Sequence, residues 1–450
     1  MKRHGRIPAA APLILAAVCM LTASSCSFHG AMSIPSSVGT EGYVTSDAEE
    51  TITAAPVSET TVVLSESVGT VAAVSAPETF TGEIPAERTE AETTSGAGTL
   101  AVRLDELCGS SGADAVQAAF IDREGTIYRY CFGFADYSEG RRVGPDTKYR
   151  VASLSKLVTD LVFMRLEEDG VVDRSADVGD YLGYAVRNPS FPDVPITAHM
   201  LMSHTSSLKD SQRFLDSRLN QSSVPMADLL SGSFSYADRA PGSAYEYSNF
   251  GVAVVGAVCE KATGQFFQSL AEKYVFSPLG IDAAYCASML RDSGDVGALY
   301  GAGSMSVSAQ LDLRFSSEPG QTHHLTQGNL TISAKDYARI LHAVLNGGVS
   351  ADGIRLVGEE AADAMLTPAF FDGSEGVGYG TFIKSGILGS GECFYHTGSN
   401  FGMYAAYVAD KETGGAYVVL TSGAPYELDG RTGIYRLCMD VIREMHDFFN

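Results

Sequence analysis

The sequence predicts an α+β fold in which one antiparallel sheet, flanked by terminal helices, carries an inserted helical region. Apolar segments of strand length occur early, at 115–121 and 126–132, split by a turn. Similar segments separated by glycine-rich turns return late, between 379 and 421. The residues between these sets follow mostly helical patterns, so we expect early and late strands to share one sheet. A catalytic site is expected where this sheet meets the helical region.

The first 25 residues have the features of an export signal. A basic head precedes an apolar run from Ile7 towards Leu21, which is short for a membrane-spanning helix, and small residues then lead into Cys26. This arrangement resembles a bacterial lipoprotein processing site. We therefore expect removal of residues 1–25 and lipid attachment at Cys26, with plain secretion or an uncleaved anchor as the alternatives.

Residues 26–99 are predicted to form a disordered tether rich in Ser, Thr and Glu. Acidic residues recur, and Arg88 is the only basic residue between 27 and 98. Such a segment repels itself and has too little apolar bulk to form a core. A flexible coil of about 70 residues spans roughly 45 to 50 Å, so the tether would let a domain at 100–450 hang from a membrane face outside the cytoplasm. The net charge of -23 argues against a nucleic-acid partner.

The early part of the domain is expected to contain a short helix over 104–108 and then the hairpin of 115–121 and 126–132. The late part is expected to contain four strands and a closing amphipathic helix. These late elements are expected at 379–383, 392–396, 403–409, 416–421 and, for the helix, 434–445.

The segment from Tyr149 to Met164 holds the first candidate site. Ser153 and Lys156 are three residues apart at the start of an apolar helix, so their side chains lie on neighbouring positions of one helical face. A serine hydroxyl attacks poorly until a base takes its proton, and a lysine in apolar surroundings can serve as that base. Free N–H groups at the helix start also favour negative charge near Ser153. The alternative is an N-capping serine beside a surface lysine.

A second candidate site is the triplet that ends in Tyr247 and Asn249 and leads into an apolar helical run. A phenol near a lysine can be stabilised as a phenolate and relay protons. The amide of Asn249 offers a donor and an acceptor for an acyl group of a substrate. Tyr245 competes with Tyr247 because both lie on the same side of an extended segment.

The third candidate site is the strand and glycine-containing turn at 393–402. A strand edge that ends in small polar residues can bind an extended substrate through its backbone, and Gly398 allows close approach. His396 and Thr397 can donate to a carboxylate or a carbonyl group.

Cysteine and histidine usage predicts no metal site. The nine histidines lack ligand spacing, and the cysteines show no C-x-x-C spacing. Buried free thiols are expected, although export also permits one or two disulfides. Six cysteines lie in the folded part: Cys108, Cys131, Cys259, Cys286, Cys393 and Cys438.

The three candidate sites, in this order and at long intervals, resemble the motifs of the penicillin-recognising serine hydrolases. These are the class C-type β-lactamases, the DD-carboxypeptidases and the related esterases and D-aminopeptidases. The resemblance covers essentially residues 100–450 and includes the segments 201–208, 328–336 and 379–380. It implies a β-lactamase/transpeptidase-like fold with the active site at the junction of sheet and helical region.

The resemblance also implies a role for each site residue. Ser153 would be the acylated nucleophile and Lys156 its base partner. Tyr247 would shuttle protons, and Asn249 would orient the substrate beside the His-Thr-Gly strand. The backbone N–H groups of Ser153 and Ser399 would form the oxyanion hole. No metal or organic cofactor is needed.

Three departures from the family pattern bear on the substrate. His396 stands where β-lactamases usually have lysine, and a mostly neutral imidazole holds a substrate carboxylate less strongly than a fixed cation. Within the family, His-Thr-Gly occurs among peptidases and esterases. Ser207 replaces the glycine expected in the segment 204–208. Residues 289–324 follow no pattern that aligns and lie where substrate-facing loops are often inserted.

The sequence therefore predicts an envelope-tethered serine hydrolase that acts through an acyl-enzyme on D-alanyl peptides or D-alanyl esters of the cell wall. It is expected to be a monomer held at the membrane by its N-terminal lipid. The alternatives are a β-lactamase, a carboxylesterase and a non-catalytic wall-binding protein of the same fold. A scaffold without catalysis would not need Ser153, Lys156 and Tyr247 together, which argues against the last alternative.

Overall fold

The computed structural model describes residues 97–219, 224–316, 318–321, 324–371 and 373–450. The expected leader, the lipidation site Cys26 and the expected tether up to residue 96 lie outside these ranges. No helix in the described part of the chain is long and apolar enough to cross a membrane. The first element, α1 (Ala97–Ser111), is longer than the helix predicted over 104–108 and begins before residue 100.

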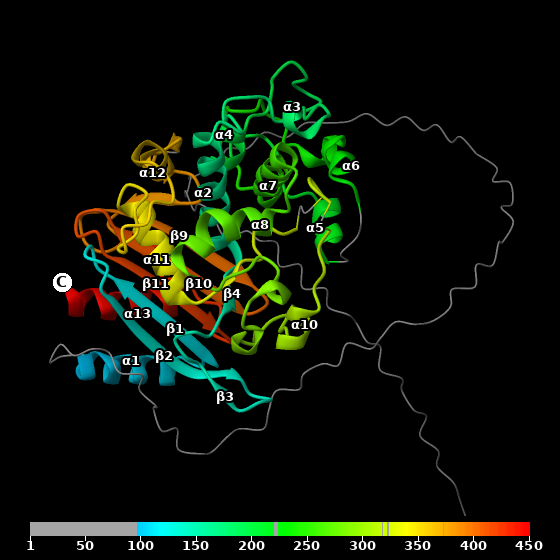
Figure 1. Cartoon of the computed structure of the whole chain (residues 1–450). Helices are drawn as coiled ribbons and strands as arrows, with labels where there is room; N and C mark the ends of the chain where they lie inside the picture. The colour runs from blue at the N-terminus through cyan, green and yellow to red at the C-terminus, as the bar shows by residue number, and fades with distance from the viewer. Residues whose placement is uncertain (1–96, 220–223, 317, 322–323, 372) are drawn as a thin grey trace, which may run out of the picture. The chain divides into compact units, whose positions relative to one another are not determined.

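The described residues form a nine-stranded sheet in the order β3-β2-β1-β11-β10-β9-β8-β7-β6. The early hairpin consists of β1 (Ala115–Ile121) and β2 (Ile127–Asp136). β1 pairs antiparallel with the late strand β11 (Ala416–Ser422), so early and late strands share one sheet, as predicted (Figure 1). The other strands of the sheet are β3 (Arg141–Arg142), β6 (Phe370–Phe371), β7 (Gly376–Val377), β8 (Phe382–Ser385), β9 (Glu392–Asn400) and β10 (Met403–Asp410).

Helices cover both faces of this sheet. α1 and α13 (Arg436–Phe449) lie together on one face, whereas α2 (Ser155–Glu168) and α11 (Ala334–Leu345) lie on the other (Figure 1). Alternate side chains of β10 accordingly divide between two apolar cores. β1, β10 and β11 are buried along their whole length, which explains why these strands read as continuous apolar runs.

The helical region is inserted between β3 and β6, as the sequence predicted. In addition to α2 and α11 it contains α3 (Val178–Leu182), α4 (Ala198–Met202), α5 (Gln212–Leu219), α6 (Met226–Leu230), α7 (Asn249–Thr263), α8 (Phe267–Ala271), α9 (Ser277–Leu279), α10 (Val307–Leu311) and α12 (Glu359–Leu366). A separate two-stranded sheet pairs β4 (Tyr149–Arg150) with β5 (Thr331–Ile332). α2 is buried along most of its length and packs against α7.

The strand predicted at 379–383 begins later than expected. β8 starts at Phe382, and Gly380 before it has φ +66. A Cβ atom on Gly380 would lie 2.5 Å from the Cα atom of Leu157. The close approach of α2 therefore requires a glycine turn where an uninterrupted strand was expected.

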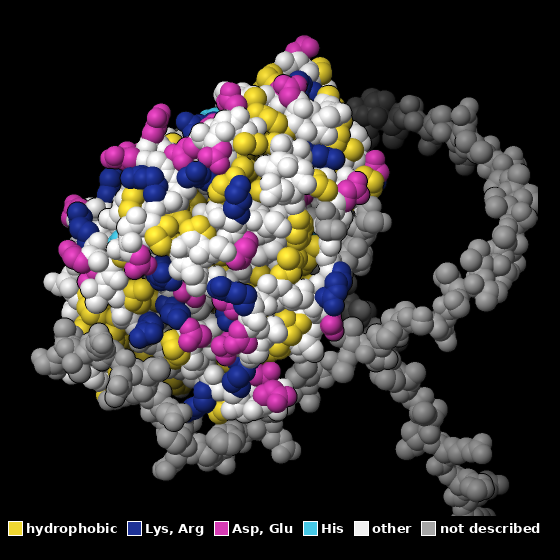
Figure 2. Space-filling view, viewed as in Figure 1, with side chains coloured by type: hydrophobic (Ala, Val, Ile, Leu, Met, Phe, Trp, Pro, Cys, Tyr) yellow, Lys and Arg dark blue, Asp and Glu magenta, His cyan; other side chains and the backbone are white. Residues whose placement is uncertain are grey.

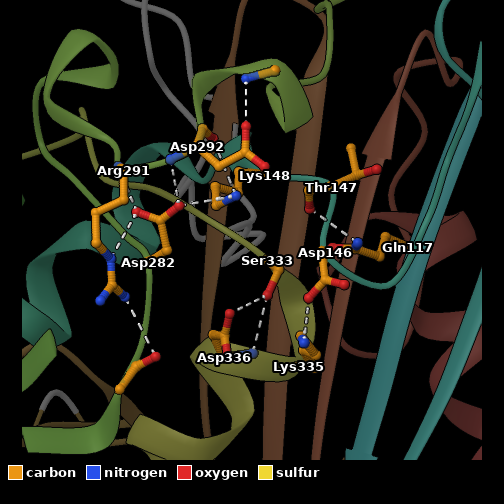
Figure 3. Close-up of polar contacts among 12 residues, drawn as sticks. Gln117, Asp146, Thr147, Lys148, Asp282, Arg291, Asp292, Ser333, Lys335 and Asp336 are labelled. Carbon is orange, nitrogen blue, oxygen red and sulfur yellow. Dashed lines mark hydrogen bonds and ion pairs between the residues drawn. The ribbon is translucent and has the colours of Figure 1, made fainter. Parts of the chain in front are cut away.

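A polar network anchors the segment 289–324 to β4 (Figure 3). Lys148, which is buried, places Nζ 3.2 Å from Asp282 Oδ2. The carboxylate of Asp282 also accepts from the backbone N–H groups of Arg291 and Asp292 at 2.9 and 3.0 Å. These contacts hold the beginning of the segment, at Arg291 and Asp292, near the start of β4.

Charged side chains of both signs are interspersed on the face shown in Figure 2.

Candidate active site

Ser153 lies in a 3₁₀ turn, η1 (Ala152–Leu154), directly before α2. Ala152 has φ +49, a left-handed conformation that costs a non-glycine residue about 1 kcal/mol or more. Hydrogen bonds on both sides hold this turn: Val151 N–H donates to Leu330 O at 2.8 Å, and Ser155 Oγ donates to Ala152 O at 2.6 Å. Ser153 is partly exposed, whereas Ala152 and Leu154 are buried.

Lys156 is completely buried and is bonded as an ammonium group. Its Nζ donates to Ser153 Oγ at 3.0 Å, to Asn249 Oδ1 at 2.8 Å and to the backbone carbonyl of Gln327 at 2.8 Å. These three acceptors match the three N–H groups of a charged lysine. With 0 % of its surface exposed, Lys156 is not the surface lysine of the alternative interpretation.

Tyr247 reaches the same oxygen from the other motif. Its hydroxyl donates to Ser153 Oγ at 2.9 Å, and its ring centroid lies 5.1 Å from Lys156 Nζ. The competing residue, Tyr245, packs its ring against Phe382, with centroids 6.5 Å apart. The structure therefore brings Tyr247, and not Tyr245, to Ser153.

His204 supports Tyr247 from the segment 204–208. Its ring lies 4.6 Å from the Tyr247 ring, and its Nδ1 accepts from the backbone N–H of Ser248 at 3.2 Å. Burial, and then the charge of Lys156, hold the pKa of His204 well below its usual value. The ring is therefore neutral and can accept this hydrogen bond.

Ser207 adopts φ +64, the left-handed region that favours the glycine expected at this position. Asn188 Nδ2 donates to Ser207 Oγ at 3.1 Å and to the backbone carbonyl of Ala237 at 2.9 Å. A glycine could not accept the first bond. The serine thus retains the turn of the segment 204–208 and gains a contact that stabilises it.

Asp210, which holds Asn249 in place, was not predicted from the sequence. Asp210 Oδ2 accepts from Asn249 Nδ2 at 2.6 Å, and Oδ1 accepts from the backbone N–H of Phe250 at 2.8 Å. Gln327 was not predicted either, because it contributes a backbone carbonyl and leaves no side-chain signal in the sequence. The sequence offered one hint of its role: Asp210 lies only two residues after the recognised segment 201–208.

β9 brings residues 396–399 to the turn that carries Ser153. Gly398 lies so close to this turn that a Cβ atom would overlap the carbonyl oxygen of Val151 and lie 3.3 Å from the backbone nitrogen of Ser153. β8 pairs with β9 only as far as Tyr395. Beyond that residue the edge of β9 lies against the turn and not against a strand, which is the arrangement expected for a substrate-binding edge.

His396 is buried and neutral. Burial, and then the charge of Lys156, lower its pKa to about 3, although its contact with Thr397 O at 2.7 Å acts in the opposite direction. Its ring packs against Phe382, with centroids 4.9 Å apart, and lies 6.3 Å from the Tyr247 ring. This position therefore offers a substrate no fixed cation.

Asp160 lies on α2 one turn after Lys156 and is 1 % exposed. Its Oδ1 has no hydrogen-bond partner among the described residues. Burial raises its pKa well above the usual value, and the charge of Lys156 only partly opposes this effect. Asp160 is a second carboxyl group that the sequence analysis did not connect with the site.

Among the described residues, no group of three or more His, Cys, Asp and Glu side chains could hold a metal ion. The six cysteines of the folded part are free thiols, and all but the half-buried Cys131 are buried.

Comparison with known proteins identifies relatives of this chain. The profile of the family described as "Beta-lactamase" matches residues 100–437. The chain is 31% identical over 165 residues to Penicillin-binding protein 4* of Bacillus subtilis, which covers 35% of this chain and 34% of that protein. It is 30% identical over 207 residues to Esterase EstB of Burkholderia gladioli, covering 41% and 51%. It is 28% identical over 189 residues to the D-alanyl-D-alanine-carboxypeptidase/endopeptidase AmpH of Escherichia coli, covering 41% and 48%.

The matched regions span about half or less of the length of these relatives. Among solved structures, the octameric penicillin-binding protein homologue from Pyrococcus abyssi superposes with a TM-score of 0.61 at 21% identity, covering 78% of this chain and 77% of that one. This likeness confirms the predicted β-lactamase/transpeptidase-like fold.

Proposed function

Since this chain belongs to the β-lactamase family of serine hydrolases, we propose that it forms an acyl-enzyme on Ser153 and cleaves D-alanyl peptides or D-alanyl esters of the cell wall. One observation carries this proposal: Ser153 Oγ receives hydrogen bonds from Lys156 Nζ at 3.0 Å and from the Tyr247 hydroxyl at 2.9 Å. A partly exposed oxygen between two proton-transfer groups has the geometry of an activated nucleophile.

Acylation follows from this geometry. In the reactive form the pair of Lys156 and Tyr247 carries one proton less, which leaves an amine or a phenolate within hydrogen-bond distance of Ser153 Oγ. That base takes the Oγ proton while the oxygen attacks the substrate carbonyl. The backbone N–H groups of Ser153 and Ser399 bind the resulting oxyanion, and loss of one such donor typically costs about a hundredfold in rate.

Collapse of the tetrahedral intermediate completes acylation. The Tyr247 hydroxyl gives its proton to the departing amine or alkoxide, and the leaving group departs. A water molecule then attacks the ester carbonyl on Ser153 while the same pair takes a proton from this water. The bond between the acyl carbon and Ser153 Oγ then breaks, the pair returns the proton to Oγ, and the carboxylic acid product leaves. Asn249, Thr397 and the edge of β9 beyond Tyr395 orient the substrate during both steps.

The substrate class and location rest on three supports. The relatives include proteins named penicillin-binding protein and D-alanyl-D-alanine-carboxypeptidase. The neutral His396 matches the His-Thr-Gly form expected among peptidases and esterases. The leader and tether expected before residue 100 would place a monomeric domain outside the cytoplasm, anchored through lipid on Cys26 or, alternatively, secreted.

A second candidate function is hydrolysis of small carboxylic esters. The buried, neutral imidazole of His396 favours it, because a substrate without a carboxylate loses nothing where position 396 offers no fixed cation. The relative named Esterase EstB agrees with this possibility.

Intact mass spectrometry over time would test both candidates. The purified protein and Ser153→Ala are each mixed with a fluorophosphonate, a penicillin, a D-alanyl-D-alanine peptide and a nitrophenyl ester. We expect a serine-dependent adduct with the fluorophosphonate and release of D-alanine from the peptide. Turnover of the nitrophenyl ester without D-alanine release would favour the esterase, and rapid penicillin turnover would favour a β-lactamase. An equal adduct on Ser153→Ala would contradict the proposed nucleophile.

A further inference from the structure

Asn249 lies between a carboxylate and an ammonium group. Its Nδ2 donates to Asp210 Oδ2 at 2.6 Å, and its Oδ1 accepts from Lys156 Nζ at 2.8 Å. The other oxygen of Asp210 accepts from the backbone N–H of Phe250 at 2.8 Å, in the first turn of α7. The helix therefore fixes Asp210, and Asp210 in turn bonds the side chain of Asn249.

A carboxylate determines which way this amide is oriented. An ionised carboxylate only accepts hydrogen bonds, so Asp210 can bond the NH₂ end of Asn249 and not its carbonyl end. The carbonyl end must then point at Lys156. In the opposite orientation, the NH₂ group of Asn249 would face the ammonium of Lys156, and both are donors. One buried N–H of Lys156 would then lose its acceptor at a substantial cost in free energy.

The other titratable groups around Lys156 cannot take over this role. His204 and His396 are neutral, because burial and the charge of Lys156 itself lower their pKa values. Tyr247 presents its ring to Lys156 Nζ at 5.1 Å. Asp160, one turn along α2, is buried, and its raised pKa disfavours the carboxylate form.

We propose that Asp210 is a positioning residue that locks the amide of Asn249 and thereby stabilises the charged form of Lys156 in the resting enzyme. The inference rests on the proposed function, since its consequence is read in the acylation of Ser153. Asp210 acts through Asn249 and touches neither the substrate nor the reacting oxygen.

The pH dependence of acylation tests this proposal. The second-order rate constant for labelling of Ser153 by a fluorophosphonate is measured from pH 5 to 10 in the full chain and in Asp210→Asn. An amide at position 210 can accept or donate, so it no longer fixes Asn249. Lys156 then gives up its proton more readily, and we expect the acid limb of the profile to move to lower pH by about half a unit or more. The plateau should fall about tenfold, because Ser153 and Lys156 are less well aligned.

Ser248→Ala is the matched control for a purely structural effect. Ser248 Oγ accepts from the backbone N–H of Gly251 at 2.9 Å and so caps α7. It also donates to Asp210 Oδ1 at 3.4 Å, but removal of this long contact leaves the bond between Asp210 and Asn249 in place. Loss of this cap should lower the melting temperature and leave the acid limb where it is in the wild type. If Asp210 served only to cap α7, Asp210→Asn would behave like this control.

A double-mutant cycle shows whether Asp210 acts through Asn249. Asn249→Ala alone should move the acid limb as Asp210→Asn does, and the double variant should move it no further. If Asp210→Asn does not fold, Asp210→Ser, which keeps a hydroxyl acceptor for the Phe250 N–H, takes its place.

An unmoved acid limb in the Asp210 variant, or shifts that add in the double variant, would overturn the inference and leave the proposed function intact. A wild-type protein that the fluorophosphonate does not label would overturn both.

Discussion

The two sides of Ser153 differ in their charge. On the helical side, α2 supplies Lys156, the start of α7 supplies Asn249, and the segment just before α7 supplies Tyr247. Three hydrogen-bond acceptors surround one buried ammonium. On the strand side, β9 supplies a backbone edge and His396, which burial keeps neutral. In the proposed mechanism, proton transfer therefore belongs to the helical side, and the strand side contributes shape and backbone groups.

This difference bears on substrate choice. A substrate carboxylate gains little from a neutral imidazole, whereas a fixed cation at the same place would bind it directly. Under the proposed function, cleavage would depend on Ser153, with weak discrimination in favour of anionic substrates. The substitutions proposed next change residues on the helical side or the strand side of Ser153, or at the contact between these two sides.

The largest effect is expected where the two sides touch. Gly398→Ala would push a methyl group into the carbonyl of Val151 and separate β9 from the turn of Ser153. Because a displacement of about 1 Å can cost a hundredfold in rate, we expect fluorophosphonate labelling to slow by about a hundredfold or more. Gly430→Ala is the control, since a Cβ atom there has nothing within 4 Å and should leave labelling unchanged. Labelling of Gly398→Ala at the wild-type rate would show that the contact is not needed.

A cation on the strand side should change selectivity. His396→Lys places a fixed charge where β-lactamases usually carry lysine, so acylation by penicillin should rise about tenfold relative to acylation by a neutral nitrophenyl ester. Repulsion from Lys156 should lower stability at the same time. His396→Gln, which is neutral, should leave the ratio of the two rates unchanged. A similar ratio in all three proteins would contradict a role of position 396 in binding anionic substrates.

A smaller effect, on stability alone, is expected at Asp160, which lies one turn after Lys156 on α2. The pKa of Asp160 is raised in the folded state, so the folded protein binds this proton more tightly than the unfolded chain. Its contribution to stability is therefore present below the unfolded pKa of about 4 and is lost as pH rises towards the folded pKa. Asp160→Asn should raise the free energy of unfolding by about 1 kcal/mol at pH 8 and by less at pH 4, measured by urea denaturation. A destabilised variant at pH 8 would mean that the ionised carboxylate supports Lys156.

Local patterns in the sequence were sufficient for much of the fold. The hairpin of β1 and β2 and the strands β9, β10 and β11 follow from apolar runs between glycine-rich turns, because these signals are read within ten residues. The spacing of Ser153 and Lys156 was equally local, since three residues on a helix place two side chains on one face. The start of β8 could not be predicted from local patterns, because the turn at Gly380 depends on the close approach of α2, which is distant in the sequence.

By itself, the sequence predicted the order of the elements, the pairing of Ser153 with Lys156 and the family to which they point. Only the tertiary structure decided that the Tyr247 hydroxyl lies 2.9 Å from Ser153 Oγ, that Asp210 fixes Asn249, and that burial lowers the pKa of His396 to about 3. The physical reason is the same in each case. Periodicity reports the neighbours of a residue along one element, whereas hydrogen-bond partners and burial are set by the packing of segments that lie tens to hundreds of residues apart.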